Sequence, residues 1–366
     1  MEITIHTQVL SIATGIGFVV GAVSSKTNFC TLGAVSDWVN IGDKARMCAW
    51  LLAIAVAILG VTILDTTGLA VIGTNTFPPY QTVSFAWLRY LLGGLMFGVG
   101  MTLASGCGNK TLIRIGSGNI KSLVVLVVAS LSAYAMLWTD FYSVVFNPWV
   151  AATSLDLKQY GFESQSVAEL LGSSHAATSS VLGITLIGLV FAAKDFRQSK
   201  DAMLGGLVMG LAVTAGWYVT GGSMGTQWKE FADFADMRPL RVDTQSLTFV
   251  SPMGDLVHYL TSPRDFSLLN FGIMTMLGVT LGAFFYSAWS RQLRRESFAS
   301  GKDFANHVIG AVLMGVGGVL AMGCTIGQGV TGVSMLAIGS FLALLSMIAG
   351  AFGTMKYLYW RILHES

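Results

Sequence analysis

Charged residues are scarce in this sequence of 366 residues, and their scarcity excludes an ordinary soluble protein. Only 11% of the residues are charged, whereas 53% are hydrophobic. A soluble domain carries about 25% charged residues. Several apolar runs reach the roughly 20 residues that a helix needs to cross the hydrocarbon core of a bilayer. The composition therefore predicts an all-α polytopic membrane protein.

Cysteine is also rare, which limits the metal and redox chemistry that the chain can support. The four cysteines, Cys30, Cys48, Cys107 and Cys324, lie in or beside apolar segments. They show neither the spacing of a zinc site nor a CxxC pair, so we expect no metal, no other cofactor and no disulfide framework. The N-terminal MEITIHTQ lacks the basic region of a cleaved signal peptide, so the first apolar run is expected to be retained. The net charge of +2 says little about partners, and we expect no nucleic acid among them.

Nine apolar segments are predicted to cross the membrane, and four shorter stretches rich in Gly, Ser, Thr or Asn follow the first, third, sixth and eighth. Broken backbone at membrane depth is stable only inside protein or beside a water-filled cavity. We therefore interpret the four as re-entrant segments with short helices; ordinary surface loops are the alternative. The spans are 8–24, 46–64, 87–105, 121–138, 179–194, 203–220, 267–290, 306–323 and 335–357. The re-entrant stretches are Asn28–Val39, Gly106–Gly118, Gly221–Lys229 and Gly323–Ser334.

Two glycine-rich stretches of the chain repeat each other. Residues 98–107 and 315–324, which are 217 positions apart, share seven of ten residues, and each ends on Gly-Cys. A weaker likeness joins 17–21 to 206–210. Four spans and a fifth, connecting span make the sixth span antiparallel to the first. The second half is therefore inverted relative to the first, and such an arrangement puts a substrate site near the midplane of the membrane. The predicted units are a first inverted repeat over 1–140, a connector with one span over 141–200 and a second repeat over 201–366.

Lysine and arginine are placed unevenly along the chain. With the N-terminus outside, most of the 21 Lys and Arg residues fall in inner segments, as the positive-inside rule requires. The C-terminus is then cytoplasmic. The stretches with Cys30 and Cys107 lie on the inner side, and the stretch with Cys324 lies on the outer side.

Three cysteines share a setting in which a glycine-rich helix gives way to a break. Cys107 and Cys324 directly follow Gly106 and Gly323, and Cys30 ends the segment SSKTNFC. Short helices after the breaks would point the positive ends of their dipoles toward the thiols, a setting that suits an anion. A neutral thiol is a weak donor that could carry an anion, whereas a thiolate would suit nucleophilic chemistry on sulfur. The sequence leaves both forms open.

Polar residues follow two of these cysteines closely. Lys110 and Arg114 could draw or release an anion, although the positive-inside rule explains them equally well. Asn109 and Gln328 could donate hydrogen bonds to a ligand, or they could cap a helix or turn. Cys48 lies in a plain apolar run, and we interpret it as packing. The candidate substrate-binding residues are therefore Cys30, Cys107, Cys324, Lys110, Gln328, Asn109, Gly106 and Gly323.

The chain resembles the YeeE/YedE-type membrane proteins of prokaryotes, a family of sulfur-compound transporters that includes thiosulfate uptake proteins. The likeness is carried by NFCTLGAVSD (28–37), GVGMTLASGCGNKTLIRIGSGN (98–119) and MGVGGVLAMGCTIGQGVTGVSMLAIGS (314–340). It implies an hourglass of inverted repeats in the cytoplasmic membrane. It also implies that thiosulfate passes between cysteines corresponding to Cys30, Cys107 and Cys324, and that a separate cytoplasmic carrier of the TusA type is a partner.

Together these features predict a transporter, not an enzyme, that brings a small sulfur oxyanion inward past a series of thiols. Thiosulfate is the first candidate. One alternative is a membrane sulfurtransferase that passes a persulfide to a cytoplasmic carrier, which predicts a mass increase of one sulfur atom on Cys30 or Cys107. The other is transport of a selenium compound or another sulfur species along the same path.

Overall fold

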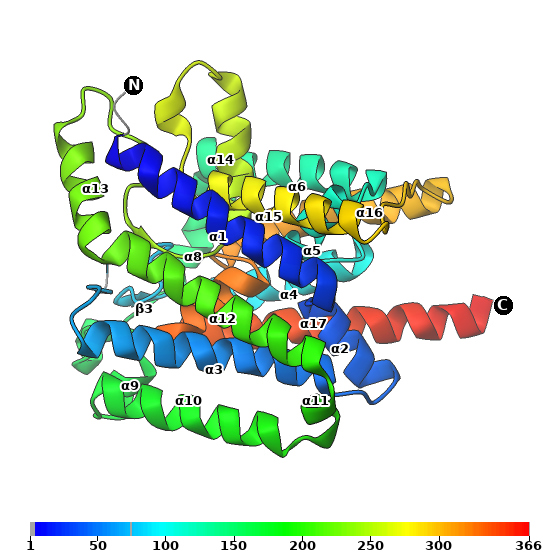
Figure 1. Ribbon diagram of the computed structural model, residues 1–366, viewed down its shortest axis with the longest axis horizontal. Coiled ribbons are helices and arrows are strands. Elements are labelled where there is room, and N and C mark those ends of the chain that lie inside the picture. Colours follow the sequence, from blue (N-terminus) through cyan, green and yellow to red (C-terminus); the bar gives the residue numbers. More distant parts are fainter. Residues whose placement is uncertain (1–3, 74, 366) are drawn as a thin grey trace.

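Helices, most of them long, make up most of the protein (Figure 1). The computed structural model describes residues 4–73 and 75–365. Within these ranges nine helical segments are long and apolar enough to cross a membrane, which is the number predicted. The two ends of the chain lie at opposite ends of the bundle (Figure 1), as an odd number of crossings requires. This architecture confirms the prediction of an all-α polytopic membrane protein.

Each predicted span corresponds to one long helix, and a short helical segment follows four of them. The long helices are α1 (Ile5–Thr27), α3 (Ala45–Thr66), α4 (Trp87–Leu103), α6 (Ile120–Trp138), α10 (His175–Ala192), α12 (Lys200–Gly221), α15 (Phe271–Trp289), α16 (Gly301–Leu320) and α17 (Ile338–Glu365). The short segments after α1, α4, α12 and α16 are α2 (Thr31–Asn40), α5 (Gly108–Gly116), α13 (Ser223–Phe234) and the π-helix η3 (Gly327–Gly332). All four breaks were predicted, although α13 extends five residues beyond the stretch expected there.

Shorter elements fill the connections between these helices. The helical ones are α7 (Phe141–Val145), α8 (Asn147–Ala152), η1 (Leu157–Tyr160), α9 (Val167–Leu170), α11 (Lys194–Gln198), α14 (Val250–Thr261) and η2 (Phe266–Leu268). Strand β1 (Thr76–Phe77) pairs in parallel with β4 (Thr244–Gln245), and β2 (Ser84–Phe85) pairs antiparallel with β3 (Leu155–Asp156). Both sheets are small and join connections that are distant in the sequence.

Helices α4 and α16 cross at glycines that let their backbones touch. A Cβ on Gly93 would lie 2.8 Å from the carbonyl oxygen of Gly317, and a Cβ on Gly100 would lie 2.6 Å from that of Gly310. Only a residue without a side chain fits at such distances, and small residues are the usual means of close helix approach in membranes. The contacts run in opposite order along the two helices, so α4 and α16 are antiparallel.

The same contacts recur in both halves of the chain. A shift of 217 positions turns the pair Gly93–Gly317 into the pair Gly310–Gly100. Outside this crossing, Gly17 of α1 packs on the backbone of α15, as Gly206 of α12 packs on that of α3. Since the equivalent helices α4 and α16 are antiparallel, these matched contacts support two inverted repeats. We retain the repeats, with the units 1–140, 141–200 and 201–366, as a proposal.

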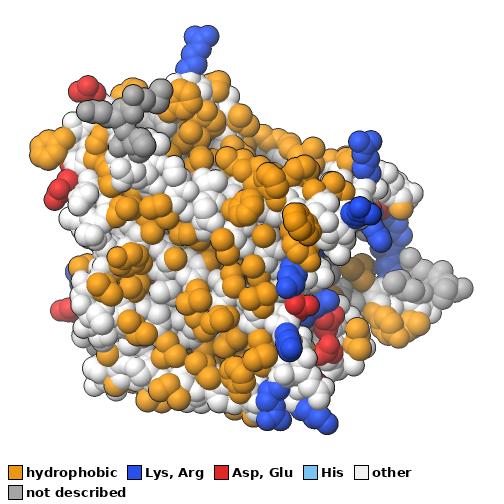
Figure 2. Space-filling model, viewed as in Figure 1, with side chains coloured by type: hydrophobic (Ala, Val, Ile, Leu, Met, Phe, Trp, Pro, Cys, Tyr) orange, Lys and Arg blue, Asp and Glu red, His pale blue; other side chains and the backbone are white. Residues whose placement is uncertain are grey.

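The outer surface of the bundle is that of a protein surrounded by lipid. Apolar side chains cover the face in Figure 2, and Lys and Arg gather toward the edge where α17 ends. Val181 and Ile184 of α10, for example, are 67% and 64% exposed. Such exposure is costly in water, whereas a bilayer accommodates it. The chain is therefore a multi-pass membrane protein.

Candidate functional site

The breaks after α4 and α16 have the same backbone geometry. Ser105 and Met322, which are 217 positions apart, both adopt left-handed conformations, with φ of 59° and 62°. The N–H groups of Gly106 and Gly323 then donate to carbonyl oxygens five residues earlier, at 2.8 Å in each case. This is the hydrogen bond of a Schellman helix end, where glycine usually takes the left-handed position. Both helices therefore stop in the same way, directly before their cysteines.

Each of the three candidate cysteines precedes a short helical segment and lies near backbone N–H groups. Cys30 and Cys107 are the residues before α2 and α5. The N–H of Gly327 donates to Cys324 Sγ at 3.4 Å. Because the N-terminal end of a helix carries a partial positive charge, all three thiols lie where negative charge is stabilised.

Cys107 links the two halves of the protein. Its thiol lies near the thiol of Cys30 and near the hydroxyl of Thr325, the residue after Cys324. The Thr325 hydroxyl has no hydrogen-bond partner among the described residues. The exposed fractions of Cys30, Cys107 and Cys324 are 8%, 1% and 1%. The structure thus brings Cys30 and Cys107 together and places Cys324 next to a residue that contacts Cys107. Thiols and hydroxyls are hydrogen-bond donors, so this cluster offers weak donors to an anion.

An open pocket of about 430 Å³ leads to Cys30 from the end of the bundle where α2 and α5 lie. Lys110 lines it, and its Nζ donates to Asn28 Oδ1 at 3.3 Å. Arg114 lines it as well, and its Nη1 donates to the carbonyl oxygen of Ser105 at 2.8 Å. The predicted residue Lys110 therefore lies on the path to the thiols. Arg114 joins it there because one turn of α5 separates the two.

Gln328 is completely buried and supports the break after α16. Its Nε2 donates to the carbonyl oxygen of Ala321, the residue directly after α16, at 2.6 Å. Its Oε1 accepts a hydrogen bond from the hydroxyl of Ser340. Both ends of the amide thus form hydrogen bonds within the protein. This agrees with the alternative that Gln328 caps a helix or turn.

The other candidates beside the cysteines are also buried or closely packed. Asn109 is 1% exposed, and its Oδ1 has no partner among the described residues. A Cβ on Gly106 would lie 3.2 Å from Lys110 Cγ, and a Cβ on Gly323 would lie 3.2 Å from Gln328 Cγ. The two glycines therefore leave room for the side chains four and five residues later. Cys48 is buried in α3 and lines none of the pockets described here.

Comparison with known proteins identifies the family of this chain. The sequence pattern of the sulphur-transport family matches residues 26–353. This chain belongs to the sulphur-transport family. It is similar to the thiosulfate transporter TsuA of Escherichia coli K12, with 27% identity over 357 residues that cover 94% of this chain and 93% of that protein. It is 23% identical to the thiosulfate transporter TsuA of Spirochaeta thermophila over 356 residues, or 94% and 98% of the two chains.

These matches confirm the family that the three segments predicted. The relatives are transporters and cover nearly the whole chain, so they favour transport over the alternative of a sulfurtransferase. In this member of the sulphur-transport family, the matched region includes Cys30, Cys107 and Cys324.

A buried extended segment, residues 244–249, covers Cys324 and was not foreseen in the sequence. No side chain in it is more than 3% exposed. The carbonyl oxygen of Leu247 accepts a hydrogen bond from Thr331 Oγ1 of η3 at 2.7 Å, and the N–H of Phe249 interacts with the thiol of Cys324. The segment TQSLTF has the polar composition of a loop, and only its packing against η3 shows that it closes this side of the site.

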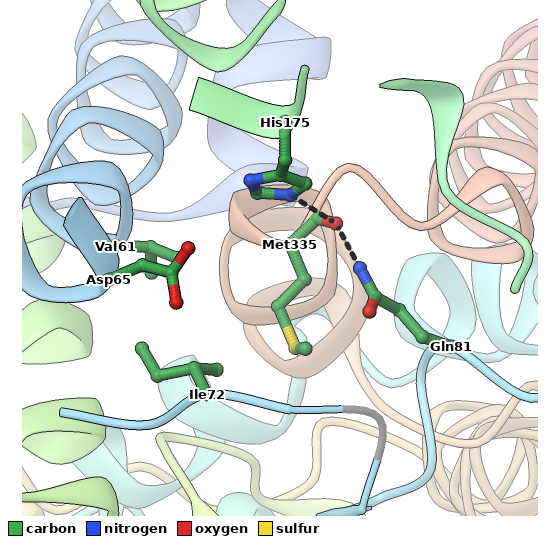
Figure 3. A pocket seen from close by; sticks show the side chains of 6 residues that line it. All are labelled: Val61, Asp65, Ile72, Gln81, His175 and Met335. Atoms are coloured by element: carbon green, nitrogen blue, oxygen red, sulfur yellow. Dashed lines mark hydrogen bonds between the residues drawn. The ribbon is translucent and has the colours of Figure 1, made fainter. Parts of the chain in front are cut away.

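A small pocket of about 170 Å³ lies at the turn between η3 and α17 (Figure 3). The carbonyl oxygen of Met335 accepts hydrogen bonds from Gln81 Nε2 at 2.7 Å and from His175 Nε2 at 3.4 Å. The next residue, Leu336, has a left-handed φ of 55°. Gln81 and His175 therefore fix this turn. Nothing in the sequence marked either residue, because Gln81 lies in the connection before α4 and His175 begins α10, and both are far from α17 in the sequence.

Proposed function

We propose that this chain carries thiosulfate inward across a prokaryotic cytoplasmic membrane, past the thiols of Cys324, Cys107 and Cys30. The observation that carries the proposal is the position of Cys107, which lies near both Cys30 and Thr325. The two named relatives, both thiosulfate transporters, support the choice of ion. Transport of a selenium compound or another sulfur species is the alternative that a competition assay separates.

In this proposal the N-terminus lies outside and the C-terminus lies in the cytoplasm. Lys and Arg gather toward the end of the bundle where α17 ends (Figure 2), and the positive-inside rule assigns such an edge to the cytoplasm. The open pocket at Cys30 includes Met355 of α17 and would then face the cytoplasm. The buried segment 244–249 would cover Cys324 from the outside.

A dianion can cross such a site only if protein groups replace its hydration. Burying an unpaired charge in an apolar medium is very costly. The thiols, the N–H groups at the starts of the short helices and the hydroxyl of Thr325 would share this task. Each contact is weak, and several weak sites in sequence let an ion both enter and leave. We place the constriction of the proposed hourglass at Cys107, which, like Cys324, is only 1% exposed.

The remaining predicted residues take supporting roles in the proposal. Lys110 attracts the ion on the cytoplasmic side, and Asn109 supplies a buried amide beside Cys107. Gln328, Gly106 and Gly323 hold the breaks in shape. A separate TusA-like carrier would receive the ion or its sulfur at the cytoplasmic pocket.

The test is uptake of labelled thiosulfate by cells that lack other thiosulfate routes. Cys324→Ala, Cys107→Ala and Cys30→Ala should each lower uptake about tenfold at matched expression, since a lost hydrogen bond costs roughly 1.4 kcal/mol. Cys48→Ala is the control, because Cys48 is as buried as Cys30, at 8% exposed, but lies in α3.

Three outcomes would count against parts of the proposal. Undiminished uptake in all four variants would contradict a role for the thiols. No uptake by the wild type would exclude thiosulfate as the substrate. A mass increase of one sulfur atom on Cys30 or Cys107 after exposure to thiosulfate would favour the sulfurtransferase.

A further inference from the structure

We infer that the pocket below Cys30 is a separate anion-binding site, in which Lys110, Arg114 and Arg46 hold the oxygen atoms of a doubly charged, tetrahedral sulfur oxyanion before its release. The inference rests on the proposed function, because it names the place where the transported ion leaves the thiols. It extends the site from Lys110 to Arg114 of α5 and adds Arg46 of α3, and both arginines line the pocket.

The first argument is charge. Within residues 4–73 and 75–365, no carboxylate forms an ion pair with Lys110 or Arg114. Their contacts are the neutral oxygens of Asn28 and Ser105. Arg46 pairs with Asp37 at 3.1 Å. Three cations and one carboxylate leave an excess of positive charge at the pocket, which favours an anion.

The second argument is the position of Arg46 relative to the thiols. A Cβ on Gly33 would lie 2.9 Å from Arg46 Nη1 and 3.6 Å from Cys30 Cβ. The guanidinium thus lies against the first turn of α2, on the same wall as Cys30. The N–H of Gly33 also interacts with the Cys30 thiol. An ion that leaves this thiol therefore meets a planar group with several donors, the geometry that suits an oxyanion.

The third argument is the size of the pocket. Its volume of about 430 Å³ exceeds that of one small tetrahedral ion. A bound ion would therefore keep part of its water, and binding would be weak enough for release. Recognition here would depend on charge and oxygen atoms. The sulfane sulfur, which distinguishes thiosulfate from sulfate, would have no part in it.

Sulfate is therefore the probe, because it tests this site without the thiol contacts. Its binding to the purified full-length protein is measured by isothermal titration at low ionic strength. Lys110→Gln and Arg114→Gln should each weaken sulfate binding about tenfold, since a hydrogen bond to a charged group contributes at least 1.4 kcal/mol. Lys110→Arg should retain binding. Lys44→Gln is the matched control, since it removes one exposed positive charge near the start of α3 without touching the pocket.

The results separate this site from the thiols. Equal weakening in Lys44→Gln would show a diffuse charge effect and overturn the site, as would unchanged binding in Arg114→Gln. Absent sulfate binding in a wild type that takes up thiosulfate would also overturn it. Sulfate binding that depends on Arg114, together with full uptake in the cysteine variants, would support the pocket and contradict the thiol path. Thermal unfolding of each variant checks that it is folded.

Discussion

Replacing Gly93 with alanine should push α4 and α16 apart. The new Cβ would lie 2.5 Å from the amide nitrogen of Ala321 and 2.8 Å from the carbonyl oxygen of Gly317. Ordinary contacts begin near 3.5 Å, so the backbones must separate by about 1 Å. The crossing directly precedes both Gly-Cys breaks, and the separation would also displace Cys107 and Cys324.

Two opposing effects set the size of the change in stability. Alanine is favoured over glycine inside a helix by about 1 kcal/mol. Overpacking a close contact costs about 1–3 kcal/mol. Gly15 of α1 is a suitable control, because a Cβ there would meet nothing within 4 Å. Gly15→Ala should therefore stabilise the protein, and the difference between the two variants, about 1–3 kcal/mol, measures the overpacking.

The assay is thermal unfolding of the purified protein in detergent, followed by the fluorescence of its 9 tryptophans. At about 2 °C per kcal/mol, Gly93→Ala should unfold roughly 2–6 °C below Gly15→Ala. Gly310→Ala should behave like Gly93→Ala, since its Cβ would lie 2.7 Å from the carbonyl oxygen of Gly100. If both crossing variants were as stable as Gly15→Ala, the close approach would be refuted. Unequal effects at Gly93 and Gly310 would contradict the proposed repeat.

Two further predictions concern buried polar groups. Asp255 is 1% exposed and accepts two hydrogen bonds of 3.0 Å from Arg241. Asp255→Ala should leave a partly buried cation unpaired and destabilise the protein by about 3–5 kcal/mol. The yield of folded protein in detergent should fall sharply, and a normal yield would contradict the prediction. Gln328→Leu should leave the Ala321 carbonyl and the Ser340 hydroxyl unpaired and cost about 1–3 kcal/mol. The unfolding temperature of Gln328→Leu should fall. The unfolding temperature of Gln81→Leu, a change that removes one hydrogen bond at a half-buried site, should fall less.

Much of the fold was predictable because membrane burial imposes simple rules on sequence. Every helix that crosses a bilayer needs a long apolar run, so the nine spans could be found within a few residues. The helix α17 is the clearest boundary error, since it continues to Glu365 instead of ending near residue 357. Its last turns lie beyond the apolar run, and hydropathy gives no signal for them.

The candidate site was predictable only in part. The repeat marked Cys107 and Cys324, because the same residues recur at both helix ends. It did not show that Gln328 is used inside the break, since a side chain that binds a ligand and one that caps a helix look alike in sequence. The residues 244–249 and the pair Gln81 and His175 gave no signal at all, because their contacts join segments far apart in the chain.

The membrane-spanning character, the number of spans, the glycine-cysteine breaks and the family could all be predicted from the sequence, because each depends on local composition or on a short motif. Which groups meet depends on the folded structure. It placed the thiol of Cys107 against Cys30 and Thr325, and Arg46 beside Lys110 and Arg114 in one pocket. Such meetings depend on helix crossings, and a crossing such as that of Gly93 and Gly317 joins residues more than two hundred positions apart.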